Sequence, residues 1–86
     1  MQGNKEHLQQ VLSNLVVKYR KVQNKSISSI SNEIGISKSI WSDLEKGIKD
    51  PQLSTLWKVA EGLNIPLSKL IAEIEYQLPN NFSFIE

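Results

Sequence analysis

A chain of 86 residues has room for one domain and not for two. The absence of cysteine excludes disulfides and thiolate metal sites, and neither a membrane span of roughly 20 apolar residues nor a secretory signal is present, so we expect a cytoplasmic protein. The net charge of +1 is unevenly distributed. Residues 18–49 carry seven basic and three acidic side chains (net +4), whereas residues 50–86 carry two basic and five acidic side chains (net −3). This contrast fits either a polyanionic partner or an unevenly charged solvated surface.

Three helices are predicted in the first half of the chain. Apolar residues recur at steps of three and four over residues 5–22, which indicates an amphipathic helix. Ser26 and Gly35 bracket a second helix, and Ser37 and Gly47 bracket a third, because serine caps helix starts and glycine commonly ends helices.

Two more helices are predicted in the second half. Apolar spacing predicts one helix from Leu53 to near Asn64 and another that begins after Pro66. Pro79 ends the last helix at the latest, since proline lacks the amide that a helix interior needs. Residues 77–86 follow, and apolar and polar side chains alternate at Phe82, Ser83 and Phe84, which predicts either a tail or a short strand.

These elements predict an all-α protein. Five short helices form one domain at residues 5–76, and the tail at residues 77–86 is a candidate dimerisation element. The second and third helices, within residues 26–46, are joined by the tight turn Gly35-Ile36-Ser37. A pair of helices with such a turn can place its second helix in the major groove of DNA.

An ordered pattern of residues extends on both sides of this turn and continues without a gap through the fifth helix. Its members are Arg20, Ser26, Ile30, Ser31, Trp41, Ser42, Leu44, Glu45, Gly47, Pro51, Thr55, Leu56, Val59, Ala60, Leu63, Asn64, Ile65, Leu67, Leu70 and Ile71. This pattern resembles the Cro/phage-repressor type of helix-turn-helix protein, also called the Xre family. The resemblance implies a five-helix lambda-repressor-like domain that binds double-stranded DNA sequence-specifically.

The resemblance also implies which residues would contact the bases. In the family, the first turns of the third helix enter the major groove, which assigns base-reading positions to Lys38, Ser39, Ser42 and Asp43. Lysine can donate to guanine O6 and N7, serine can bond to either type of base edge, and aspartate can accept from the cytosine amino group.

Five further positions would contact phosphates by the same resemblance. They are Ile27 and Ser28 at the start of the second helix, where amides attract anions, and Lys46, Gly47 and Lys49 after the third. The family often has glutamine where Ile27 stands and a neutral or basic residue at position 43. The recognition surface is therefore only mildly basic, and we expect high affinity to need two copies.

Arg20 and Glu45 are either two separate surface charges or a structural pair. In the family, the matching residues form a partly buried ion pair that ties the first helix to the end of the third. A solvated Glu45 beside Lys46 would oppose DNA, whereas pairing with Arg20 would neutralise it. We therefore expect the ion pair.

Other side chains have simpler interpretations. Trp41 could stack on a base, but its inward phase predicts a core position, and Trp57 is expected in the core or at an interface. The single histidine, His7, has no companion metal ligand and is distant from the serines of residues 26–42, so we predict no metal, no cofactor and no enzyme activity.

The prediction is a small transcriptional regulator of the repressor type that acts as a homodimer on a palindromic operator. We expect the dimer contact from helix five and the tail, because their apolar side chains exceed what the domain can bury: Leu67, Ile71, Ile74, Tyr76, Leu78, Phe82, Phe84 and Ile85. An antitoxin, or another protein-interaction module that retains the fold, is the alternative. The 86 residues leave no room for a ligand-sensing domain, so we expect control by protein level, competing sites or a partner protein.

Overall fold

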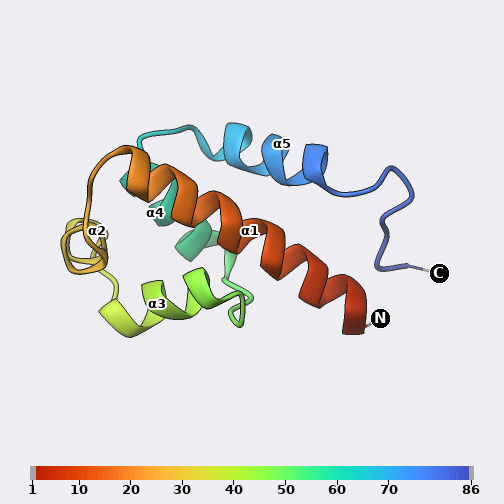
Figure 1. The fold of residues 1–86 in the computed structure, drawn as a ribbon, viewed down its shortest axis with the longest axis horizontal. Coiled ribbons are helices and arrows are strands. Elements are labelled where there is room, and N and C mark those ends of the chain that lie inside the picture. The colour runs from red at the N-terminus through yellow and green to blue at the C-terminus, as the bar shows by residue number, and fades with distance from the viewer. Residues whose placement is uncertain (1, 86) are drawn as a thin grey trace.

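The computed structural model describes residues 2–85, in which five helices are joined by short turns (Figure 1). The helices are α1 (Gln2–Val22), α2 (Ile27–Ile34), α3 (Lys38–Lys46), α4 (Leu53–Gly62) and α5 (Leu67–Gln77). The predicted all-α class with five helices is confirmed. None of these helices has the length and hydropathy that crossing a membrane requires.

The residues that cap the helices lie where the sequence predicts. The hydroxyls of Ser26 and Ser37 accept backbone amides at the starts of α2 and α3. Gly35 and Gly47 end these helices with φ angles of 73° and 74°, in the left-handed region that favours glycine. Asn24, just after the end of α1, also has a positive φ of 56°.

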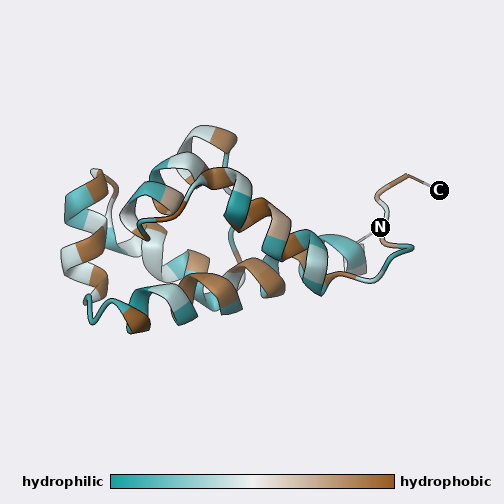
Figure 2. Ribbon diagram, turned by 90° about the horizontal axis from the view of Figure 1, so that it is seen from above, coloured by the Kyte–Doolittle hydropathy of each residue, from teal (hydrophilic) through white to brown (hydrophobic). Residues whose placement is uncertain are grey.

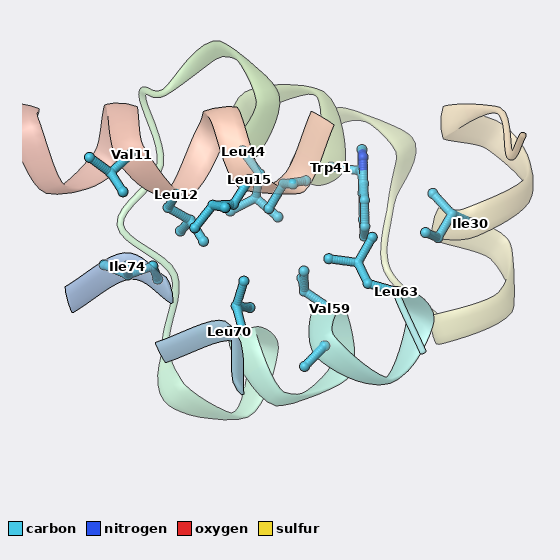
Figure 3. Close-up of a cluster of buried hydrophobic side chains, with 12 residues drawn as sticks. Val11, Leu12, Leu15, Ile30, Trp41, Leu44, Val59, Leu63, Leu70 and Ile74 are labelled. Carbon is cyan, nitrogen blue, oxygen red and sulfur yellow. The ribbon is translucent and has the colours of Figure 1, made fainter. Parts of the chain in front are cut away.

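The hydrophobic core lies where the apolar sides of all five helices meet (Figure 3). Trp41 of α3 is completely buried there, as its inward phase predicts. The other large buried side chains are Leu15, Val16, Ile30, Leu44, Val59, Leu63 and Leu70. Trp41 is the largest of these side chains, so its burial in the core holds α3 against the rest of the domain.

The packing of the helices places α3 at an edge of the domain. α1 packs against both α3 and α5, while α2 packs against α3 and α4 (Figure 1). The contact between α2 and α4 is especially close at Gly62, where a Cβ atom would lie 2.7 Å from Cγ2 of Ile34. The helix-turn-helix is therefore supported from two sides, by α1 and by α4.

The C-terminal segment is a tail, one of the two forms that the sequence allowed, and not a short strand. Within the described residues it forms turns and bends instead of a strand, since an all-α domain offers no strand edge for pairing. It returns to the first turns of α1, where the Asn4 side-chain amide donates to the Ser83 carbonyl at 2.5 Å (Figures 1 and 2). The Phe82 ring packs edge-on against His7, with centroids 6.1 Å apart. Phe82 thus has a place in the domain, contrary to expectation, whereas Ile85 is 87% exposed.

Trp57 lies differently from one of its two predicted positions, and Tyr76 is exposed, as an apolar side chain in excess of the core would be. Trp57 is 56% exposed on α4, so a core position is wrong and only the interface alternative stays open. Tyr76 is 90% exposed while Ile74 is buried, so the two do not share one apolar face of α5. Residues two apart on a helix point to different sides, which explains the separation.

Candidate nucleic-acid interface

The outward side of α3 is uniformly polar. At 100° per residue, the four base-reading positions and Lys46 fall within one sector, opposite the buried Trp41 and Leu44. Lys38, Ser39 and Lys46 are exposed, while Ser42 and Asp43 are half-buried. The structure therefore brings all five candidate DNA contacts of α3 onto one face.

The last turn of α3 is tied to α1 through Glu45. The Arg20 Nε donates to Glu45 Oε2 at 2.5 Å, and its Nη2 donates to Oε1 at 3.0 Å. The side chains of this pair are only 14% and 11% exposed. The Trp41 indole also donates to Oε2, at 2.6 Å, and the Ser13 hydroxyl donates to the Glu45 carbonyl at 2.5 Å. These bonds fix both the side chain and the backbone of Glu45.

The electrostatic surroundings keep this pair ionised. Burial disfavours the charged form of Glu45, but hydrogen bonds from Arg20 and Trp41, with the charges of Arg20 and Lys21, outweigh it and hold the pKa of the carboxyl below its usual value. The hydrogen bond to Glu45 raises the pKa of Arg20. The carboxylate next to Lys46 is thus compensated inside the protein, which reduces its repulsion of a phosphate.

Arg20 also positions the start of α2. Its Nη1 donates to the Lys25 carbonyl at 2.8 Å, one residue before the N-cap Ser26. One guanidinium therefore contacts α3 and the loop that leads into α2. Both helices of the helix-turn-helix are held in relation to α1 by the same side chain.

The start of α2 offers backbone amides where a phosphate contact was predicted. The Ser26 hydroxyl accepts the amide of Ser29 at 3.0 Å, and the amides of Ile27 and Ser28 precede it at the helix N-terminus. The Ile27 side chain packs against the core, so only its amide could serve a phosphate. Ser28 is exposed, and its hydroxyl could contribute as well.

The end of α3 includes Gly47, a predicted phosphate contact, in the cap of the helix. The Gly47 amide bonds to the carbonyls of Asp43 and Leu44, and the Ile48 amide bonds to the Asp43 carbonyl. Both amides are engaged in ending the helix, which leaves the side chains of Lys46 and Lys49 as the phosphate-binding candidates there. Lys46 is exposed and Lys49 is half-buried.

Two buried serines also shape the helix-turn-helix: Ser31, which belongs to the sequence pattern, and Ser13, which sequence reasoning missed. Ser13 holds the Glu45 carbonyl, and Ser31 donates to the Ile27 carbonyl at 2.7 Å within α2. Each is 3% exposed. For Ser13, the available signal was its place in the apolar stripe of α1, between Leu12 and Val16, where a buried hydroxyl needs a partner.

Comparison with known proteins identifies the family to which this domain belongs. The model of the helix-turn-helix family HTH_3 matches residues 16–70. The chain belongs to the HTH_3 helix-turn-helix family. The predicted resemblance and the lambda-repressor-like fold are thereby confirmed. The family is one of DNA-binding transcriptional regulators and not of enzymes.

Two relatives of this HTH_3 domain extend the comparison. The HTH-type transcriptional regulator SutR of Escherichia coli (strain K12) is 32% identical over 75 residues, which cover 87% of this chain and 42% of that protein. The crystal structure of an HTH_3 family transcriptional regulator from Vibrio cholerae is similar with a TM-score of 0.76 at 27% identity, covering 94% of this chain and 46% of that one. This chain therefore spans less than half the length of either relative.

Proposed function

We propose that this HTH_3 domain binds double-stranded DNA sequence-specifically, with α3 in the major groove, as part of a transcriptional repressor. The proposal rests on the polar outward face of α3, whose opposite face is fixed by the buried Trp41 and by the Arg20–Glu45 pair. A helix held in this way can present side chains to base edges with little loss of order on binding. A role on DNA agrees with the cytoplasmic location expected from the sequence.

Within this proposal the residues of α3 divide into two kinds of contact. Lys38 donates to a guanine, Ser39 and Ser42 bond to neighbouring base edges, and Asp43 accepts from a cytosine amino group. Because Asp43 repels phosphate, it weakens binding to arbitrary sequences and so favours specificity. The side chains of Lys46 and Lys49 contact the backbone and set the orientation of α3.

A second phosphate would bind at the start of α2. The amides of Ile27 and Ser28 point along the helix axis at its positive end, where an anion is favoured. Since Arg20 contacts both the loop before α2 and the end of α3, the two phosphate-binding places keep a fixed separation.

We further propose that the protein acts as a homodimer on a palindromic operator. Three lysines and the acidic Asp43 make the candidate interface only mildly basic, so one copy would bind weakly. Two copies related by a two-fold axis would place their α3 helices about 34 Å apart, one turn of DNA. The tail is partly engaged with α1, which leaves α5 as the stronger candidate for the dimer contact.

The test is selection of bound DNA from a random library with the purified chain. The expected result is enrichment of one sequence whose two halves are related by inverted symmetry and centred about 10 base pairs apart. Lys38→Ala should alter the enriched sequence, whereas Lys69→Ala, at an exposed lysine of α5, should leave it unchanged. Failure to enrich any sequence above the starting library would contradict specific DNA binding.

A further inference from the structure

The outward face of α3 carries one acidic side chain, Asp43, which is half-buried there. The neighbouring carboxylates of the helix-turn-helix each have a cation beside them. Glu45 lies 2.5 Å from the Arg20 guanidinium, and Glu33 lies 2.9 Å from Lys25 Nζ. Within the part of the chain that the structure describes, no salt bridge engages Asp43. Its negative charge is therefore uncompensated on the very surface proposed to meet a polyanion.

The backbone at Asp43 is held in place on both sides of the helix. Its carbonyl accepts the amides of Gly47 and Ile48, which end α3. On the opposite side, Trp41 and Leu44 are buried in the core (Figure 3). Because aspartate is short and its backbone is fixed, the carboxylate can move only through its two side-chain torsions. The chemistry of the group placed against Asp43 therefore decides whether this residue helps or opposes binding.

Few groups in the major groove suit a carboxylate, which can only accept hydrogen bonds. Guanine presents O6 and N7 there and thymine presents O4, all of which are acceptors. Adenine has an amino group at N6, but the N7 acceptor lies beside it on the same edge. Cytosine presents the N4 amino group with no acceptor beside it on its own edge. This group is therefore the best partner for Asp43.

The cytosine amino group has only one hydrogen available to Asp43. Its other hydrogen bonds to guanine within the base pair. A methyl group on N4 must lie on the groove side if the pair is to be kept, because the remaining hydrogen is needed for pairing. The modified base then places a methyl group where Asp43 needs a donor. The half-buried carboxylate loses its hydrogen bond and some of its water without any compensation.

We propose that Asp43 makes DNA binding by this domain sensitive to methylation of the N4 amino group of one operator cytosine. The unmodified amino group donates to the carboxylate and permits binding, whereas the N4-methylated base opposes it. A methyltransferase that modifies this nitrogen would thus release the protein from its operator. The inference rests on the proposed function and adds to it a form of control that acts on the DNA.

The test begins by locating the contacted cytosine. The unaltered chain and Asp43→Ala each select bound sequences from a random library, and a cytosine preference that only Asp43→Ala loses marks the position. Operators are then made with N4-methylcytosine or C5-methylcytosine at that position. Both place a methyl group in the major groove, but only the first removes the hydrogen that Asp43 accepts.

The two modified operators should bind differently to the unaltered chain. N4-methylation should weaken binding roughly 5- to 150-fold, the range that one base contact supplies, whereas C5-methylation should have a much smaller effect. Asp43→Ala should bind the N4-methylated and unmodified operators equally, because it has no carboxylate that can lose a partner. Lys38→Ala is the matched control on the same helix and should keep the full sensitivity, since it alters a different contact.

Circular-dichroism melts identify a variant that is merely unfolded. Should Asp43→Ala be unfolded, Asp43→Asn takes its place: its amide can donate as well as accept, so both the cytosine preference and the sensitivity to N4-methylation should fall. Three results overturn the inference: no cytosine preference that depends on Asp43, equal binding of the unaltered chain to N4-methylated and unmodified operators, or an equal loss for the two methyl positions.

Failure of this inference is distinguishable from failure of the proposed function. A chain that enriches no sequence from the library contradicts specific DNA binding itself. A chain that selects an operator but binds its N4-methylated and unmodified forms alike leaves the proposed function intact, and removes only the sensitivity to methylation assigned to Asp43.

Discussion

Arg20 and Glu45 join the C-terminal end of α1 to the last turn of α3 through two parallel hydrogen bonds of 2.5 and 3.0 Å. The same carboxylate accepts the indole of Trp41, and the same guanidinium donates to the Lys25 carbonyl ahead of α2. The pair is therefore part of a network that connects three helices. Such a network costs much more to break at one member than to replace as a whole.

We predict strong energetic coupling between Arg20 and Glu45. Arg20→Ala leaves a largely buried carboxylate without its cation, and Glu45→Ala leaves the guanidinium without its acceptor. Each should lower the free energy of unfolding by roughly 2–4 kcal/mol. The double variant should lose much less than the sum of the two, because neither charge is then left unpaired. Urea denaturation of the four proteins measures the coupling, and additive losses would show that the two charges act separately.

The ionisation of Glu45 should make the free energy of unfolding depend on pH. Its pKa in the folded state is lowered from the ordinary value of 4.5, so its contribution is fully present above that value and is lost as the pH falls through the lower folded value. Glu45→Gln should therefore destabilise the protein most near neutral pH, and the difference should shrink as the pH falls below 4.5. Glu6→Gln, at an exposed position of α1, is the matched control. An equal loss for Glu45→Gln at both pH values would contradict the mechanism.

The sequence was most informative where a single residue type decides the local structure. Serine caps and positive-φ glycines at Ser26, Gly35, Ser37 and Gly47 defined the helix-turn-helix before any tertiary contact was known. The inward phase of Trp41 likewise followed from helical periodicity. In each case the determining interaction is local, so short-range patterns are sufficient to predict it.

Features that depend on distant contacts could not be predicted in the same way. The tail packs on α1 through Asn4 with Ser83 and His7 with Phe82, pairs more than 70 residues apart in the chain. The exposure of Trp57 depends on how α5 crosses α4, which leaves a groove beside it instead of a filled core. The engagement of the Gly47 amide required the actual geometry of the α3 cap.

The close contact between α2 and α4 makes Gly62 sensitive to a single added methyl group. In Gly62→Ala the new Cβ would lie 2.7 Å from Cγ2 of Ile34 and 3.3 Å from Cγ1 of Ile30. Alanine favours helix by about 1 kcal/mol over glycine, but overpacking of a core typically costs 1–3 kcal/mol, so we expect a net loss on the order of 1 kcal/mol. The β-branched Ile34 has few rotamers with which to move away. Thermal or urea denaturation measures the change.

Gly3→Ala is the natural control for this substitution. Gly3 also lies in a helix, but a Cβ there would meet nothing within 4 Å. Its replacement should be neutral or slightly stabilising, because only helix propensity changes. If the steric contact with Ile34 causes the loss of stability, Gly62→Ala should lower the free energy of unfolding less in an Ile34→Ala background than in the unaltered chain. A stabilising effect of Gly62→Ala alone would show that α4 can shift away from α2.

Lys38 and Lys46 should affect DNA binding in different ways, although both are exposed on the same face of α3. Lys38 stands at the first position of the helix, where a side chain reaches base edges. Lys38→Ala should therefore change base preference and weaken operator binding by on the order of 1–3 kcal/mol. Lys46 stands in the last turn, where we propose a contact to a DNA phosphate, so Lys46→Ala should weaken all sequences about equally and reduce the salt slope by about 1.

These two effects can be separated by titrating the selected operator and a scrambled duplex at several salt concentrations. For Lys38→Ala the ratio of the two affinities should fall, because a contact to a base is lost only on the operator. For Lys46→Ala the ratio should hold while both affinities fall, because a phosphate is present in every sequence. Lys69→Ala controls for the loss of one positive charge far from α3. Unchanged operator affinity in both α3 variants would mean that another element of the domain contacts the bases.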